Sequence, residues 1–395
     1  MKTKAPYIIA GLGIVIVILA LVIPSITQSK YLRSAKAGGD YLVRQMHEDG
    51  SFVYDYDPLT GDESPSYNIL RHAGTAYSLI DLYEATGDEQ YLRAGEKALT
   101  YLDNQIIPCP ELVGGQPLVD AACVEEDGEI KLGGNALAIL AFTEHTAVTG
   151  SKQYLPRAQQ LARFVVSTQR QNGEFSVHKI DSSSGAPEDF ESGYYPGEAL
   201  FALARLSAVD HDSLWINAAH NAAHWIIDVR DANIPTKDLN HDHWLLYGLS
   251  ELYTDRPDKE YLAHAKRIVE SIAASQHPSV RSGETVDHPE WAGGFYEPPR
   301  STPTATRSEG LGAAYTIFTR AGEEAYATVV KDVMRKAIDF ELRTQFTATQ
   351  LALLGADMTA QGAFHSGLDT YDVRIDYIQH NISALLAFDR IENGE

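Results

Sequence analysis

The chain has 395 residues, 44% of them hydrophobic, so it can bury one large core or the cores of two ordinary domains. Its 54 acidic and 32 basic residues give a formal net charge of -22. Binding of nucleic acid needs a basic face that neutralises phosphates, so this charge argues against a nucleic-acid partner.

The N-terminal segment differs from the rest of the chain. Residues 5–29 contain no charged side chain, and residues 8–23 are almost wholly aliphatic. This run approaches the about 20 residues that span a bilayer. We expect residues 1–29 to form an uncleaved signal anchor, a single transmembrane helix, with residues 30–395 as an exported globular domain at the cell membrane. A cleaved signal peptide is the alternative.

The rest of the chain repeats one short phrase. It reads Gly-Asp-Glu-Gln-Tyr-Leu at 87–92, Gly-Ser-Lys-Gln-Tyr-Leu at 150–155 and Asp-Lys-Glu-Tyr-Leu at 258–262, with looser copies at 210–215 and 321–326. Each copy is typical of the end of one helix, a tight polar turn and the start of the next helix. Repetition at this spacing predicts an array of helical hairpins.

A period of 3.6 residues divides the predicted helices into two alternating sets. The first, which we call outer, covers residues 31–45, 89–105, 153–169, 213–229, 259–276 and 323–345. The second, called inner, covers residues 68–86, 134–149, 196–209, 241–253, 309–321 and 376–391. The inner set is rich in Ala, Gly and Leu, which lets helices pack closely in a central ring.

The order of the two sets predicts a closed ring. The chain begins with an outer helix and ends with an inner one, so the last helix can pair with the first. Closure removes the exposed ends that an open array of repeats must cap. We therefore predict an all-α fold of six helical hairpins, with an open superhelix of helix pairs as the alternative.

Two phrases support a resemblance to a known superfamily: Asp49-Gly50-Ser51-Phe52, and the segment from Glu191 to Glu198. With the hairpin architecture, they resemble the (α/α)6 toroid superfamily of six-hairpin glycosidases, uronyl hydrolases, polysaccharide lyases and sugar epimerases, over roughly residues 31–395. The resemblance implies a carbohydrate-active enzyme. Terpene cyclases and prenyltransferases share the toroid, but this sequence has neither an Asp-rich ionisation motif nor a plausible Asp/Cys/His zinc set. No metal or other cofactor is expected.

The loops that enter the inner helices carry the candidate functional residues. Arg71 suits a substrate carboxylate, because its fork donates two parallel hydrogen bonds, and His72 can transfer protons near neutral pH. Glu191 and Glu198 frame the third inner helix, and paired carboxylates divide acid and base roles in glycosidic chemistry.

The loops later in the chain place a histidine-rich segment at the start of one inner helix and charged residues at the starts of two others. His241 and His243 flank Asp242, but alternate helical residues point about 200° apart, which is poor geometry for one metal ion. Instead of a metal site, we favour a role for Trp244 in stacking on a sugar ring, beside a polar pair formed by His241 and Asp242. Asp376, Gln379 and His380 share one helix face, because they are spaced i, i+3 and i+4.

If the ring closes, these side chains converge on one pocket. We predict catalytic roles for Glu191, Asp376, Glu309, His72 and His380. We predict substrate-binding roles for Tyr54, Tyr56, Arg71, Tyr195, His241, Asp242, Trp244 and Arg307.

The predicted function is that of a membrane-anchored, exported enzyme acting on a poly- or oligosaccharide, possibly one containing uronic acid. Hydrolysis, β-elimination and epimerisation stay open, since all three use acid/base groups of this kind. The alternatives are a non-catalytic glycan-binding or envelope polysaccharide assembly factor and, less favoured because of the charged mouth, a terpenoid-cyclase-like enzyme. Cys109 and Cys123 are the two cysteines, and they either pair as a disulfide or remain free thiols.

Overall fold

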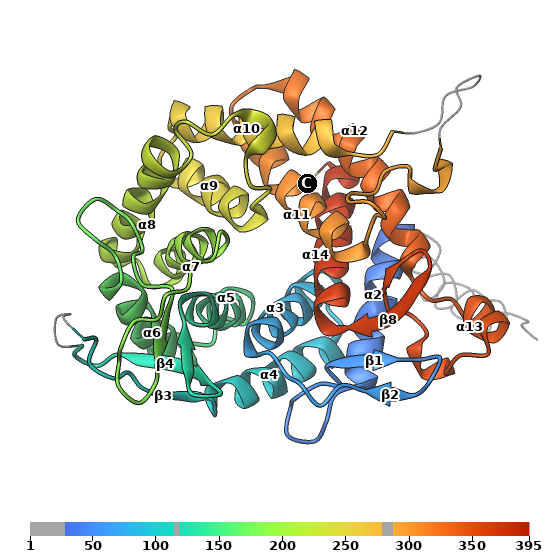
Figure 1. Cartoon of the computed structure of the whole chain (residues 1–395), viewed down its shortest axis with the longest axis horizontal. Helices are drawn as coiled ribbons and strands as arrows, with labels where there is room; N and C mark the ends of the chain where they lie inside the picture. The colour runs from blue at the N-terminus through green and yellow to red at the C-terminus, as the bar shows by residue number, and fades with distance from the viewer. Residues whose placement is uncertain (1–27, 114–117, 279–286, 395) are drawn as a thin grey trace, which may run out of the picture.

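The computed structural model of the protein describes residues 28–113, 118–278 and 287–394. Within these ranges, twelve helices alternate between two layers, as predicted (Figure 1). The inner helices are α3 (Ile69–Thr86), α5 (Leu132–Thr149), α7 (Tyr195–Asp210), α9 (His243–Asp255), α11 (Ser301–Arg320) and α14 (Ile375–Asn393). The outer helices are α2 (Lys30–Arg44), α4 (Glu89–Asp103), α6 (Leu155–Ser167), α8 (Ser213–Trp225), α10 (Lys259–Ser275) and α12 (Glu324–Glu341).

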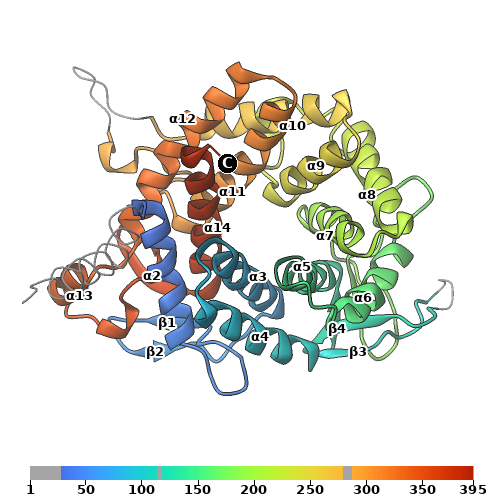
Figure 2. The ribbon, with the colours of Figure 1, turned by 180° about the vertical axis from the view of Figure 1, so that it is seen from behind.

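The inner helices form a closed ring, which Figures 1 and 2 show from both sides. Each inner helix contacts the next one, and α14 contacts both α3 and α2. The predicted pairing of the last helix with the first is therefore confirmed, and the open superhelix is wrong. The core fills the space around the ring, and α5 is buried without a break from Leu132 to Thr146, as expected for a helix that is apolar all round.

The same kind of glycine turn recurs after four of the outer helices, and each turn packs against the next outer helix. Four such glycines have φ between +85° and +95°, and a Cβ on any of them would lie 2.1–2.3 Å from a backbone carbonyl oxygen of the next outer helix. Only glycine combines this backbone conformation with so close an approach. The four are Gly50 on α4, Gly173 on α8, Gly293 on α12 and Gly362 on α2.

A glutamine at the end of the preceding outer helix reinforces three of these turns. In each case its side-chain amide donates one hydrogen bond to the turn glycine and a second to the next outer helix. Gln169 reaches Gly173 and Ala218, Gln276 reaches Gly293 and Val333, and Gln345 reaches Gly362 and Ser34, all at 2.9–3.1 Å. The last pair closes the ring, because Ser34 belongs to the first outer helix.

Two small antiparallel sheets, which the all-α prediction missed, cover the loop end of the ring. One has the order β2 (Asp62–Glu63), β1 (Asp55–Asp57), β8 (Thr370–Arg374), β7 (His365–Gly367), and so joins both ends of the domain. The other runs β3 (Ile106–Pro108), β4 (Ala122–Glu126), β5 (Glu129–Lys131), β6 (Lys179–Asp181). Strands this short carry no readable alternation of polar and apolar residues.

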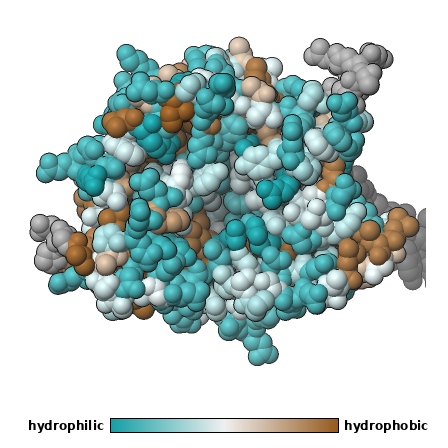
Figure 3. Space-filling view, viewed as in Figure 1, coloured by the Kyte–Doolittle hydropathy of each residue, from teal (hydrophilic) through white to brown (hydrophobic). Residues whose placement is uncertain are grey.

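The Cys109–Cys123 pair, left open by the sequence, is a disulfide beside β3 and β4. A short additional helix, α13 (Ala348–Leu354), lies outside the two layers (Figure 1). The molecular surface is mainly hydrophilic in the face of Figure 3, in keeping with the acidic composition.

The predicted anchor at residues 1–29 lies almost entirely outside the described residues, which begin at residue 28. Within the described ranges, none of the helices combines the length and the apolar character needed to span a bilayer.

The closing turn provides a test of the ring. Gly362 and Gly87 both have positive φ, at +90° and +67°, but only Gly362 faces a neighbouring carbonyl oxygen, that of Ala37. Gly362→Ala should lower the free energy of unfolding by about 1–3 kcal/mol more than Gly87→Ala, because the added methyl group collides with α2. Equilibrium denaturation of the two variants measures the difference. Equal losses would show that backbone conformation alone, and not the contact with α2, selects glycine there.

Candidate active site

A cavity of about 400 Å³ opens at the end of the ring where the inner helices begin. Six of the predicted residues line it: Arg71, Tyr195, Trp244, Arg307, Asp376 and His380. They come from α3, α7, α9, α11 and α14, so residues far apart in the sequence meet because the ring closes.

Four more predicted residues lie behind this lining. Tyr54 accepts a hydrogen bond from Arg71, and His241 Nδ1 accepts one of 2.9 Å from Arg307 Nε. Asp242 is buried and caps α9 by accepting a hydrogen bond of 3.1 Å from the backbone nitrogen of Leu245. Glu309 is buried beneath His380, to which it is hydrogen-bonded.

Three predicted residues lie away from the cavity lining. His72 is buried between α3 and α4, where its ring nitrogens contact the Tyr67 hydroxyl group at 2.7 Å and the Ala98 carbonyl oxygen at 2.9 Å. Tyr56, on β1, donates a hydrogen bond of 2.6 Å to Asp357, and Glu191 is exposed in the loop before α7. For His72 the reason is helical geometry: one step along a helix turns a side chain by about 100°, so His72 faces outward where Arg71 faces inward.

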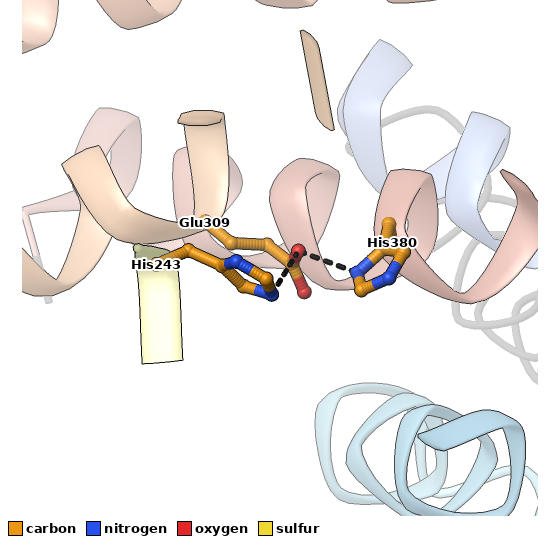
Figure 4. Close-up of side chains that lie close together, drawn as sticks. All are labelled: His243, Glu309 and His380. Atoms are coloured by element: carbon orange, nitrogen blue, oxygen red, sulfur yellow. Dashed lines mark hydrogen bonds and ion pairs between the residues drawn. The ribbon is translucent and has the colours of Figure 1, made fainter. Parts of the chain in front are cut away.

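The cavity wall holds a cluster of three side chains from three helices, namely His243, Glu309 and His380 (Figure 4). His380 Nδ1 lies 2.7 Å from Glu309 Oε2, and His243 Nε2 lies 3.8 Å from the same oxygen. The two imidazole rings are edge to face, with centroids 5.3 Å apart. Both ring nitrogens of His243 are buried, and neither has a hydrogen-bond partner among the described residues.

The pKa values of the two histidines are shifted in opposite directions. Burial, with the positive charges of His380 and Arg307 nearby, holds the pKa of His243 well below its ordinary value. Burial acts in the same direction on His380, but the Glu309 carboxylate outweighs it and raises the pKa of His380. The cluster therefore places an imidazole that favours its neutral form beside one whose charged form is stabilised.

The same three side chains also fit a metal ion. Their ligand atoms all lie within 4.8 Å of one another, and two imidazoles with one carboxylate are a donor set that zinc accepts. The sequence argument against a metal concerned His241 and His243, which do point apart. The structure instead brings His243 to ligands from two other helices.

Two carboxyl groups line the cavity in contrasting environments. Asp376 pairs with Arg374 at 2.6 and 3.0 Å and with Arg71 at 3.2 Å. Glu198 is buried with no hydrogen-bond partner for Oε2 among the described residues. Burial, and secondarily the neighbouring Asp242 carboxylate, raise the pKa of Glu198 to about 8. Glu198 therefore carries its proton at neutral pH.

Several lining residues are absent from the predicted catalytic and substrate-binding sets: Glu198, which the sequence offered only as a partner of Glu191, His243, which it weighed only as a metal ligand, Tyr194 and Tyr296. The signal for Glu198 was present, because it stands three residues after Tyr195 and so shares its helix face. His243 could not be found in this way, because its partners lie on other helices.

Comparison with known proteins places this geometry in context. No protein-family model and no curated protein matches the sequence. Solved structures match at the level of fold. A D-mannose isomerase superposes with a TM-score of 0.66 at 13% identity, over 92% of this chain and 98% of that chain.

Two further matches have different activities. The cellobiose 2-epimerase from Bacillus thermoamylovorans gives a TM-score of 0.62 at 12% identity, over 92% of this chain and all (100%) of that chain. The alpha-1,6-mannanase GH76A from Salegentibacter sp. gives a TM-score of 0.60 at 13% identity, over 91% of this chain and 99% of that chain. These neighbours are (α/α)6 toroids, so this chain has that fold and the predicted resemblance is confirmed.

The protonation of Glu198 predicts a pH effect on stability. Between the ordinary pKa of 4.5 and the folded-state pKa of about 8, the native state holds a proton that the unfolded chain has released. Stability therefore falls as pH rises through this window, by up to about 1.4 kcal/mol per pH unit from this group. Glu198→Gln should remove that contribution, so the free energy of unfolding should fall less steeply with pH in the variant. Parallel pH profiles for the variant and the unchanged protein would contradict the assignment.

Proposed function

We propose that the protein is a carbohydrate-active enzyme that transfers a proton at the carbon next to a sugar's carbonyl group, as an isomerase or 2-epimerase. The observation that carries the proposal is the position of His243 and His380 on one wall of a sugar-sized cavity, with the Glu309 carboxylate 2.7 Å from His380 Nδ1 and the pKa values of the two histidines shifted in opposite directions. The cavity volume of about 400 Å³ lies within the range of small-molecule sites.

The roles follow from this arrangement. His243 takes the proton from carbon, while His380 donates a hydrogen bond, and then a proton, to the carbonyl oxygen, so that an enediol forms. Return of a proton to the former carbonyl carbon, with loss of the hydroxyl proton on the neighbouring carbon, gives the isomer. Return of a proton to the same carbon from the other face, with loss of the proton on the former carbonyl oxygen, gives the epimer. Glu309 holds His380 in place and favours its charged form. Groups of this kind contribute about 10²- to 10⁴-fold each to the rate.

The remaining lining residues suit a sugar. Trp244, Tyr194 and Tyr195 offer aromatic faces to its apolar side, and Arg71 offers hydrogen-bond donors to its hydroxyl groups. The fold adds support, because the matching structures include a D-mannose isomerase and a cellobiose 2-epimerase.

Glycoside hydrolysis is a second candidate, favoured by the two carboxyl groups on the same cavity. The proton-bearing Glu198 would be the general acid, and the Asp376 carboxylate would act opposite it. Both carboxylate oxygens of Asp376 are engaged by arginines, Arg374 and Arg71, so we rank this reaction below proton transfer. A glycan-binding role without catalysis would show neither reaction.

An exchange experiment separates these functions. Incubation of the protein with aldoses and disaccharides in D2O should place deuterium on the carbon next to the carbonyl group, detected by NMR. His243→Asn and His380→Asn should each slow this exchange at least about 100-fold, whereas exchange by the control His47→Asn, an exposed loop histidine, should be unchanged. Loss of exchange on addition of EDTA would assign the cluster to a metal instead. New reducing ends without exchange would favour hydrolysis.

We also propose that residues 1–29 anchor the enzyme in the cell membrane, with the toroid on the extracytoplasmic side. The uncharged stretch at residues 5–29 supports the anchor, and the Cys109–Cys123 disulfide supports an oxidising compartment.

Fractionation tests this proposal. The full chain should sediment with membranes and resist extraction by high salt, and its globular part should be digested by protease added outside intact cells. A chain that begins at residue 28 should remain in the soluble fraction. Membrane association of the shortened chain, or protection of the globular part from external protease, would contradict the proposal.

A further inference from the structure

The cavity is positively charged in a protein of strongly negative net charge, -22. Two guanidinium groups, Arg71 and Arg307, line it against one paired carboxylate, that of Asp376. The Glu309–His380 pair adds no net charge, and Glu198 carries its proton. A positive site in an acidic molecule draws anions from solution.

Of the two arginines that line the cavity, Arg307 is the one with no carboxylate partner among the described residues. It is buried, with only 8% of its surface exposed, and no carboxylate oxygen among the described residues lies within 4.0 Å of it. Half-buried arginines differ: Arg71, Arg205 and Arg390 are each paired with an acidic side chain. A buried charge is costly unless an opposite charge accompanies it.

The surroundings of Arg307 hold its guanidinium group in one orientation. Nε donates to His241 Nδ1 at 2.9 Å, and Nη1 donates to the Pro303 carbonyl oxygen at 2.8 Å. The guanidinium group also lies over the rings of Tyr296, at 4.9 Å, and Phe295, at 5.2 Å. Its Nη2 has no hydrogen-bond partner among the described residues. A rigid donor next to a cavity is the arrangement that binds a planar anion.

We infer that the substrate of this cavity is a uronic acid, a sugar that carries a carboxylate, and that Arg307 binds that carboxylate. The inference rests on the proposed function for the choice of a sugar. A carboxylate suits the site better than a phosphate, because its single charge balances Arg307 and its oxygens can accept hydrogen bonds from Nη2, the guanidinium nitrogen without a partner among the described residues. A phosphate group would bring up to two negative charges and more oxygens than these donors can satisfy.

The test is the affinity of matched ligand pairs for the full chain, measured by isothermal titration calorimetry. Glucuronate, galacturonate and mannuronate are each compared with the corresponding neutral hexose and with its 6-phosphate. At least one uronate should bind about tenfold or more tightly than both of its counterparts, as expected for a hydrogen bond to a charged group.

Variants connect this preference to the residue. Arg307→Gln should remove the preference for the uronate, and Arg307→Lys should keep part of it, because charge remains but the fork is lost. Arg320→Gln is the matched control, since Arg320 is exposed at the far end of the same helix, and it should keep the full preference. Circular dichroism checks that each variant is folded.

The outcomes are distinct from those for the proposed function. Equal affinity within all three pairs, tighter binding of a hexose 6-phosphate, or a uronate preference that survives in Arg307→Gln would each overturn the inference. Uronate binding that needs Arg307 but gives no deuterium exchange would leave the inference standing and overturn the proposed proton transfer. Deuterium exchange with neutral sugars, without any preference for a uronate, would leave the proposed proton transfer standing and overturn the inference.

Discussion

Closure of the ring between the sixth hairpin and the first is the constraint on which the rest of this structure depends. It is made by the turn that recurs between outer helices: a glycine with positive φ placed against a carbonyl oxygen, with a glutamine amide that bonds to both sides. At the closing position Gln345 and Gly362 attach the last outer helix to α2. Because these contacts join residues more than 300 positions apart, they hold both ends of the domain together.

The ring places the starts of its inner helices around one opening, and this creates the cavity. Residues on α3, α7, α9, α11 and α14 face one another there without being neighbours in the sequence. The interior tolerates polar groups that would be unfavourable elsewhere, such as the unpartnered nitrogens of His243 and the free carboxyl oxygens of Glu198 and Asp242. Buried groups of this kind are rare in ordinary cores, and these three residues lie in or beside the cavity.

Burial around the cluster lowers the pKa of both His243 and His380, but at His380 the contact with Glu309 outweighs burial and raises the pKa. One carboxylate thus gives two identical side chains opposite pKa shifts. The positive charge of Arg307 lowers the pKa of His243 further.

Repetition along the chain was sufficient to predict six hairpins, two alternating helix layers and closure, because helical period and turn chemistry are local properties. It also located the end of the ring where the cavity opens and six residues of the cavity lining. His72, Tyr56 and Glu191 lie away from that lining, and the predicted fifth inner helix began at residue 309 although α11 starts at Ser301. Pro303 looked like a loop residue, yet proline is accepted in the first turn of a helix. Which side chains point into the ring, and which three meet around Glu309, was decided only by tertiary structure, because those contacts join different helices and no local pattern encodes them.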